Sequence, residues 1–123
     1  MAKTHEDLDV WRLAMTLAEH VYQETRGFPR EEIFGLTSQL RRSAVSIPSN
    51  IAEGAARNGN KEFLQFLHVA AGSASELSTQ LELAKRIGLG DGERLEQLVE
   101  ETARVSKMLQ GLIRATRKRS SGP

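Results

Sequence analysis

The sequence predicts an all-α protein, an up-and-down left-handed four-helix bundle formed by residues 1–119 as a single domain, with a frayed tail at 120–123. Strong helix formers dominate the composition, and only three prolines and one tyrosine occur in 123 residues. Apolar residues recur at steps of three and four positions in four segments. Short connections force consecutive helices to fold back on each other, and seams spaced at 3.5 residues predict left-handed packing.

The first predicted helix runs from about Leu8 to Thr25. Asp7 or Asp9 is expected to cap its start, because a short acceptor side chain can bind an unpaired amide there. Gly27 is placed to end it. The apolar stripe consists of Val10, Leu13, Ala14, Leu17, Ala18 and Val21.

The second predicted helix keeps its apolar phase across a proline. Its stripe consists of Ile33, Leu36, Leu40, Ala44, Ile47, Ile51 and Ala55. A proline inside a helix removes one hydrogen bond and presses on the preceding turn, so the helix either stops at Ile47 or continues with a kink at Pro48. We expect the kinked, continuing helix, because Ile51 and Ala55 stay on the apolar face.

The third predicted helix, Lys61 to Ile87, carries the most regular stripe. Steps of four and three alternate without a slip, which is a heptad pattern. Asn60 is expected at its N-cap, and Gly88 at the left-handed position that follows its end. The stripe consists of Phe63, Leu67, Ala70, Ala74, Leu77, Leu81 and Ala84.

The fourth predicted helix runs from about Gly92 to Arg117, with Asp91 as its cap. Its last turn is basic, which suits the negative end of a helix dipole. The stripe consists of Leu95, Leu98, Thr102, Val105, Leu109, Leu112 and Thr116.

Composition excludes several classes of function. Seventeen lysines and arginines against sixteen aspartates and glutamates leave a net charge of +1, unlike the strongly basic balance of many nucleic-acid binders. The absence of cysteine excludes disulfides, thiolate nucleophiles and cysteine-ligated metals. The opening MAKTHEDLDV lacks the apolar run of a signal peptide, and no stretch of about 18 apolar residues occurs. We therefore expect a cytoplasmic protein.

No motif of a metal, cofactor or catalytic site is present. None of His5, His20 and His68 has a glutamate three positions before it, as a di-iron bundle would require. The glycines of residues 88–92 lack the Lys-Ser/Thr of a phosphate-binding loop, and no serine lies in a Gly-x-Ser-x-Gly elbow. We expect no enzymatic activity and no cofactor.

The small net charge is the sum of acidic and basic segments that largely cancel. Residues 1–25 carry −3, residues 26–61 carry +3, residues 62–90 carry −1 and residues 91–123 carry +2. One interpretation is a surface that engages the phosphates of RNA or DNA. The alternative is solvated helix faces, dipole compensation and ion pairs between subunits. The candidate phosphate-binding residues are Arg41, Arg42, Arg57, Lys61, Arg117, Lys118 and Arg119.

Small and polar side chains interrupt the second and third helices. Small residues let helices approach closely, and polar side chains at such a contact must bind one another. We predict a structural or assembly network that includes Arg41, Asn50, Glu53 and Glu76, with a ligand pocket as the alternative.

Residues 36–54 read LTSQLRRSAVSIPSNIAEG, and this run resembles the hallmark of the 23S rRNA intervening-sequence protein family. The tail beyond Leu112 resembles no part of the family pattern. Four other stretches fit the pattern, namely residues 9–11 (DVW), 61–67 (KEFLQFL), 72–81 (GSASELSTQL) and 83–89 (LAKRIGL).

The resemblance implies a four-helix fold, a ring-shaped homopentamer and no known enzymatic activity. Some relatives are encoded inside intervening sequences of 23S rRNA genes. Others resemble the accessory variability determinant of diversity-generating retroelements, a basic pentamer that associates with a reverse transcriptase and nucleic acid. The net charge of +1 departs from these basic relatives. We therefore expect a non-enzymatic homo-oligomeric scaffold or adaptor in an RNA-related context, with direct RNA or DNA binding as the alternative.

Overall fold

The structure, a computed structural model, describes residues 5–120 except for the side chains of Asp7 and Ser120. The described chain contains helices and no strand, which confirms the all-α prediction. Residues 121–123 of the expected tail lie outside the described residues, and Ser120 belongs to the last helix. The helices are α1 (Asp9–Thr25), α2 (Leu36–Ala55), α3 (Asn60–Arg86) and α4 (Gly92–Ser120), with 3-10 turns at His5–Asp7 and Arg30–Glu32.

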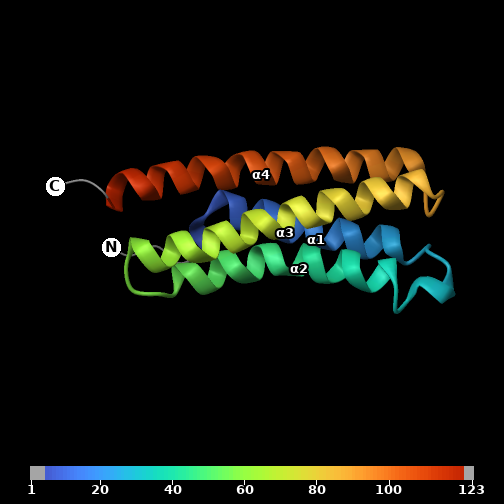
Figure 1. Ribbon diagram of the computed structural model, residues 1–123, viewed down its shortest axis with the longest axis horizontal. Helices are drawn as coiled ribbons and strands as arrows, with labels where there is room; N and C mark the ends of the chain where they lie inside the picture. The colour runs from blue at the N-terminus through green and yellow to red at the C-terminus, as the bar shows by residue number, and fades with distance from the viewer. Residues whose placement is uncertain (1–4, 121–123) are drawn as a thin grey trace.

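The four helices form an up-and-down bundle in which each helix has two neighbours (Figure 1). α1 packs against α2 and α4, and α3 packs against the same two helices. Within the described residues, no close backbone contact joins the diagonal pairs α1–α3 and α2–α4. The connection between α2 and α3 lies at the same end as the C-terminal end of α4, and the other two connections lie at the opposite end. The left-handed crossing and the kink remain predictions.

α2 continues as a helix through Pro48, as expected, but it begins later than the apolar spacing predicted. The expected stripe included Ile33, which the structure leaves 50% exposed in the connection before α2. A 3-10 turn follows Pro29, and the Glu32 carboxylate then accepts a 3.1 Å hydrogen bond from the amide of Leu36. This contact satisfies one of the unpaired amides that begin a helix, so the helix starts after Gly35.

The predicted stripes form most of the core. Their buried members pack in one cluster that all four helices share. One correction concerns α4, where Ile113 is buried and the predicted Leu112 is only partly so, because the inward face continues four positions beyond Leu109. Thr102 and Thr116 are fully buried, and the Thr102 hydroxyl donates to the carbonyl of Leu98 at 2.7 Å. That bond lets a polar side chain occupy the core.

The helix ends follow the predicted capping residues in part. Asp91 caps α4, since its carboxylate accepts from the amide of Glu93 at 2.9 Å. Gly88 has the left-handed φ of +78° that was expected after α3. Asn60 is already the first helical residue of α3, and the cap is Gly59 with a φ of +97°. Leu8 precedes α1 without a side-chain cap; the expected alternative, Asp9, pairs with Arg12 at 2.7 Å, and the Asp7 side chain lies outside the described residues.

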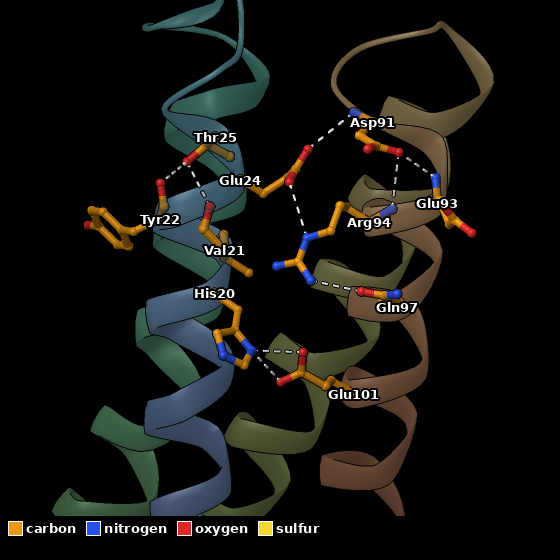
Figure 2. Close-up of polar contacts among 10 residues, drawn as sticks. All are labelled: His20, Val21, Tyr22, Glu24, Thr25, Asp91, Glu93, Arg94, Gln97 and Glu101. Carbon is orange, nitrogen blue, oxygen red and sulfur yellow. Dashed lines mark hydrogen bonds and ion pairs between the residues drawn. The ribbon is translucent and has the colours of Figure 1, made fainter.

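Polar contacts join α1 to the N-terminal half of α4 (Figure 2). The Glu24 carboxylate accepts a 3.1 Å hydrogen bond from the amide of Asp91 and lies 3.7 Å from the Arg94 guanidinium. About one turn before Glu24 on α1, His20 Nδ1 lies 2.9 Å from the Glu101 carboxylate. These contacts lie on the side of α1 that faces α4. The side of α1 that faces α2 borders a groove.

Candidate functional site

An apolar groove follows the outer junction of α1 and α2, and we call it the α1–α2 groove. It has a volume of about 590 Å³. Met15 and Val45 are each 41% exposed in it, although both are large and apolar. Exposed apolar surface of this kind marks interaction sites in soluble proteins. Its apolar and aromatic lining consists of Trp11, Met15, Ala18, Tyr22, Val45, Pro48 and Ala52.

The groove was not predicted from the sequence, although the apolar spacing contains a signal for it. On α1 the positions 11, 15, 18 and 22 follow steps of four, three and four, and on α2 the positions 45, 48 and 52 follow steps of three and four. Each helix therefore carries a second apolar stripe beside the one that enters the core. The two second stripes meet because α1 and α2 are neighbours in the bundle.

A second hollow lies next to the groove, toward the N-terminal end of α2, and we call it the guanidinium hollow. It has a volume of about 550 Å³ and brings together two of the predicted phosphate-binding residues, Arg41 and Arg42. Arg41 Nε donates a 2.9 Å hydrogen bond to Thr25 Oγ1, and its guanidinium lies 4.5 Å from the centre of the Tyr22 ring. The lining consists of Tyr22, Ile33, Thr37, Ser38, Arg41, Arg42, Val45 and Ser46.

The other predicted phosphate-binding residues lie at the opposite end of α2, which we call the basic end. Arg57 and Arg119 line one hollow of about 550 Å³ there. Lys61 is exposed in the first turn of α3, and Arg117 Nη2 lies 3.2 Å from His68 Nε2. Lys118 neighbours them on the last turn of α4.

The structure thus divides the predicted phosphate-binding set into two groups. At 1.5 Å of rise per residue, Arg42 and Arg57 are separated by about 20 Å along α2. Part of the charge at the basic end is also compensated, because Arg57 lies 3.7 Å from the Glu53 carboxylate and 5.2 Å from the centre of the Phe66 ring. A single continuous basic surface on one chain is therefore not formed by these seven residues.

The α2–α3 contact contains hydrogen-bonded polar side chains, but mostly not the four that the sequence suggested. Of those four, only Asn50 reaches this region, and it does so within α2, where its Nδ2 donates to the Ser46 carbonyl and hydroxyl at 2.8 and 3.0 Å. Arg41 turns toward α1, Glu53 pairs with Arg57, and Glu76 is exposed. The structure therefore does not bring the four residues together.

Two pairs of side chains form the polar contact between α2 and α3. The Ser43 hydroxyl donates to Gln80 Oε1 at 2.9 Å, and both side chains are buried. The hydroxyl oxygens of Ser46 and Ser73 lie 2.7 Å apart. The small polar character of this contact was visible in the sequence, whereas the partners depend on how two antiparallel helices are aligned.

Within residues 5–120, no group of three or more histidine, aspartate or glutamate side chains is arranged to hold a metal ion. The described helices include none that is long and apolar enough to cross a membrane.

Comparison with known proteins agrees with this architecture. The family model of the 23S rRNA-intervening sequence protein matches residues 6–111. The fold is similar to a solved protein of unknown function from the S23 ribosomal protein family of Bacteroides thetaiotaomicron, with a TM-score of 0.76 and 24% identity over 85% of this chain and 97% of that chain. No curated protein matches. Because the family model covers most of the chain, including α1 to α3 and most of α4, the protein belongs to the 23S rRNA-intervening sequence protein family.

Proposed function

We propose that the protein is a non-enzymatic, cytoplasmic scaffold or adaptor that works as a homo-oligomer, with the α1–α2 groove as one half of the contact between subunits. The second apolar stripes of α1 and α2 carry this proposal. They place Met15, Val45 and an aromatic side chain, Tyr22, in solvent on a single chain. Burying such a groove against another copy removes apolar area from water, at roughly 25 cal/mol per Å².

The other half of the contact is a different surface of the next copy. A ring with an odd number of subunits, such as the pentamer that the family resemblance implies, needs a heterologous contact between two unlike patches. Phe34, in the connection before α2, is 96% exposed, the highest exposure of any large apolar side chain in the described residues. We propose that Phe34 of one copy inserts into the α1–α2 groove of its neighbour.

The first prediction tests this assembly. We expect the wild-type protein to have five times the 13.6 kDa mass of the chain, as measured by native mass spectrometry and sedimentation. Met15→Glu should shift the protein to monomers, because the contact would bury an unpaired carboxylate. Phe34→Ser should weaken assembly without unfolding the chain, since Phe34 is almost fully exposed.

Val69→Ser is the matched control for this experiment. Val69 is 51% exposed on α3, away from the groove, so its loss should leave the mass unchanged. A wild-type protein that stays monomeric at tens of micromolar would contradict the proposal. So would a Met15→Glu variant that assembles as the wild type does.

An RNA-related context is part of this proposal. The family is named after intervening sequences of 23S rRNA, and a nonenzymatic assembly there would hold RNA, DNA or an enzyme that acts on them. Its partners are then other copies of the chain and a nucleic-acid component.

A second candidate function, direct RNA or DNA binding, is favoured by the basic end. Arg57 and Arg119 share one hollow there, and Lys61 lies on the adjacent first turn of α3. In an assembled ring these ends would repeat in every subunit, which would strengthen their field.

The second prediction concerns this nucleic-acid binding. Affinity for a fluorescent RNA should fall steeply as salt rises, because each neutralised phosphate releases counterions. Lys61→Gln and Arg119→Gln should each reduce the slope of log K against log salt by about 0.7 to 0.9. Arg104→Gln, an exposed position on α4, is the control. Absence of binding at low salt would eliminate this candidate.

A further inference from the structure

We propose that the guanidinium hollow is a binding site for a phosphate monoester, which Arg41 and Arg42 hold through its oxygens. The two arginines are consecutive on α2, and both line the hollow. No aspartate or glutamate is among the residues that line it. Two guanidinium groups match the two negative charges of a phosphate monoester, and charge-assisted hydrogen bonds to phosphate are the strong class. This site lies within one chain, separate from the basic end, and it shares Tyr22 and Val45 with the α1–α2 groove.

Arg41 is held in one orientation before any ligand arrives. Thr25 is buried, and its hydroxyl donates to the carbonyl of Val21 at 2.8 Å, which leaves its oxygen free to accept from Arg41 Nε. The guanidinium plane lies over the Tyr22 ring at 4.5 Å. Figure 2 shows the Tyr22 ring projecting from α1 away from α4. Two contacts from α1 therefore fix the Arg41 side chain, and less rotational entropy is lost when a ligand binds.

The donors that Arg41 presents to the hollow are unused. Its single hydrogen bond goes through Nε, so Nη1 and Nη2 have no hydrogen-bond partner among residues 5–120. Over the same residues, no carboxylate pairs with Arg42. A positioned guanidinium with an open edge beside a second one is the arrangement that recognises phosphate in a bidentate manner.

A hydroxyl in the lining also lacks a partner. Thr37 is 4% exposed, and its Oγ1 is the one buried side-chain polar atom without a hydrogen bond in the described part of the chain. Leaving a buried hydroxyl unpaired is unfavourable, so such a group calls for a functional explanation. Ser38 follows it in the same lining. The Ser38 hydroxyl can donate to a phosphate oxygen, whereas Thr37 Oγ1 would first have to turn out of the core to do so.

The rest of the hollow favours a phosphate that carries an organic group. Ile33 and Val45, which are 50% and 41% exposed, add apolar surface to the lining, and a volume of about 550 Å³ exceeds what a phosphate ion fills. Ligand pockets characteristically combine apolar walls with a few placed polar groups. Two sources supply this chemistry, a free mononucleotide and the 5′-phosphate of an oligonucleotide.

The third prediction tests the site by calorimetric titration of the full chain in low-phosphate buffer. We expect AMP to bind more tightly than inorganic phosphate, and adenosine to show no binding. Arg42→Gln should weaken AMP binding by roughly ten- to a hundredfold, the range expected for the loss of hydrogen bonds to a charged group. Arg42 is exposed and has no ion-pair partner in the described part of the chain, so this variant should keep the wild-type Tm and assembly mass. Arg104→Gln, equal in charge change, should bind AMP as the wild type does.

Further arms identify the source of the phosphate. A 5′-phosphorylated oligonucleotide that binds at least tenfold more tightly than its 5′-hydroxyl counterpart, in an Arg42-dependent manner, supports the site with a nucleic-acid end as ligand. Arg42-dependent binding of AMP alone supports it with a small molecule as ligand. Equal affinity of AMP for the wild type and Arg42→Gln, equal affinity for AMP and adenosine, or no binding of either phosphorylated probe would overturn the proposal.

Discussion

Replacing Gly54 with alanine is expected to destabilise the protein by about 1 to 3 kcal/mol, the usual cost of overpacking a tightly packed contact. Gly54 is buried where α2 approaches α3. A Cβ atom at this position would lie 2.7 Å from Phe66 Cβ and 3.0 Å from Phe63 Cδ1. Phe66 Cβ is next to the backbone and cannot move aside, so the two helices would have to separate. Gly54 also lies in the last turn of α2, where alanine adds little helix stability.

Gly72→Ala is the matched control, and its effect should have the opposite sign. Gly72 is exposed in the middle of α3, and a Cβ there meets nothing within 4 Å. Alanine should therefore stabilise the helix by about 0.8 to 1 kcal/mol. Urea unfolding at one fixed protein concentration measures both variants, since assembly adds a concentration-dependent contribution. Stabilisation of both variants would show that α2 and α3 are not in close contact at Gly54.

Breaking the buried Ser43–Gln80 hydrogen bond is expected to cost about 1 to 3 kcal/mol when only one partner is removed. Gln80→Leu preserves most of the side-chain volume but leaves the Ser43 hydroxyl buried without its acceptor. Ser43→Ala in turn removes the donor of Gln80 Oε1. The double variant leaves neither group unpaired, so it should recover much of the loss.

A double-mutant cycle from urea unfolding measures this coupling. We expect an interaction energy of about 1 kcal/mol or more between Ser43 and Gln80, within the range seen for residues in contact. Gln97→Leu serves as the control, because Gln97 is exposed and its partner Arg94 can bind water instead; its effect should stay within about 0.5 kcal/mol. Additive effects of the two single variants would contradict a specific hydrogen bond at this position.

The helices and their inward faces were predictable because periodicity and capping are local properties. The spacing on α3 identified Leu67, Leu77 and Leu81, which are all fully buried. The spacing on α2 wrongly predicted that Ile33 is a core residue. A 3-10 turn and a hydrogen bond from the Leu36 amide to the Glu32 carboxylate place the start of α2 after Ile33. Apolar spacing reports a helix face, but a capping contact from the preceding turn determines where the helix begins.

The candidate sites were predictable only as residue types. Arg41 and Arg42 were identified as phosphate-binding candidates from charge, and the structure places both in one hollow. Charge could not show that Thr25 and Tyr22 hold Arg41, because these residues lie on a different helix. Nor could charge along the sequence show that the Glu53 carboxylate partly neutralises Arg57 at the far end of α2.

The amino-acid sequence by itself determined the number and order of the helices, the apolar face that each turns to the core, and the family motif in residues 36–54. The tertiary structure alone decided that the second apolar stripes of α1 and α2 share a groove, and that Ser43 meets Gln80. The reason is that spacing along one helix encodes which residues share a face. Which face of a neighbouring helix they meet depends on the rotation and alignment of both helices in the packed bundle.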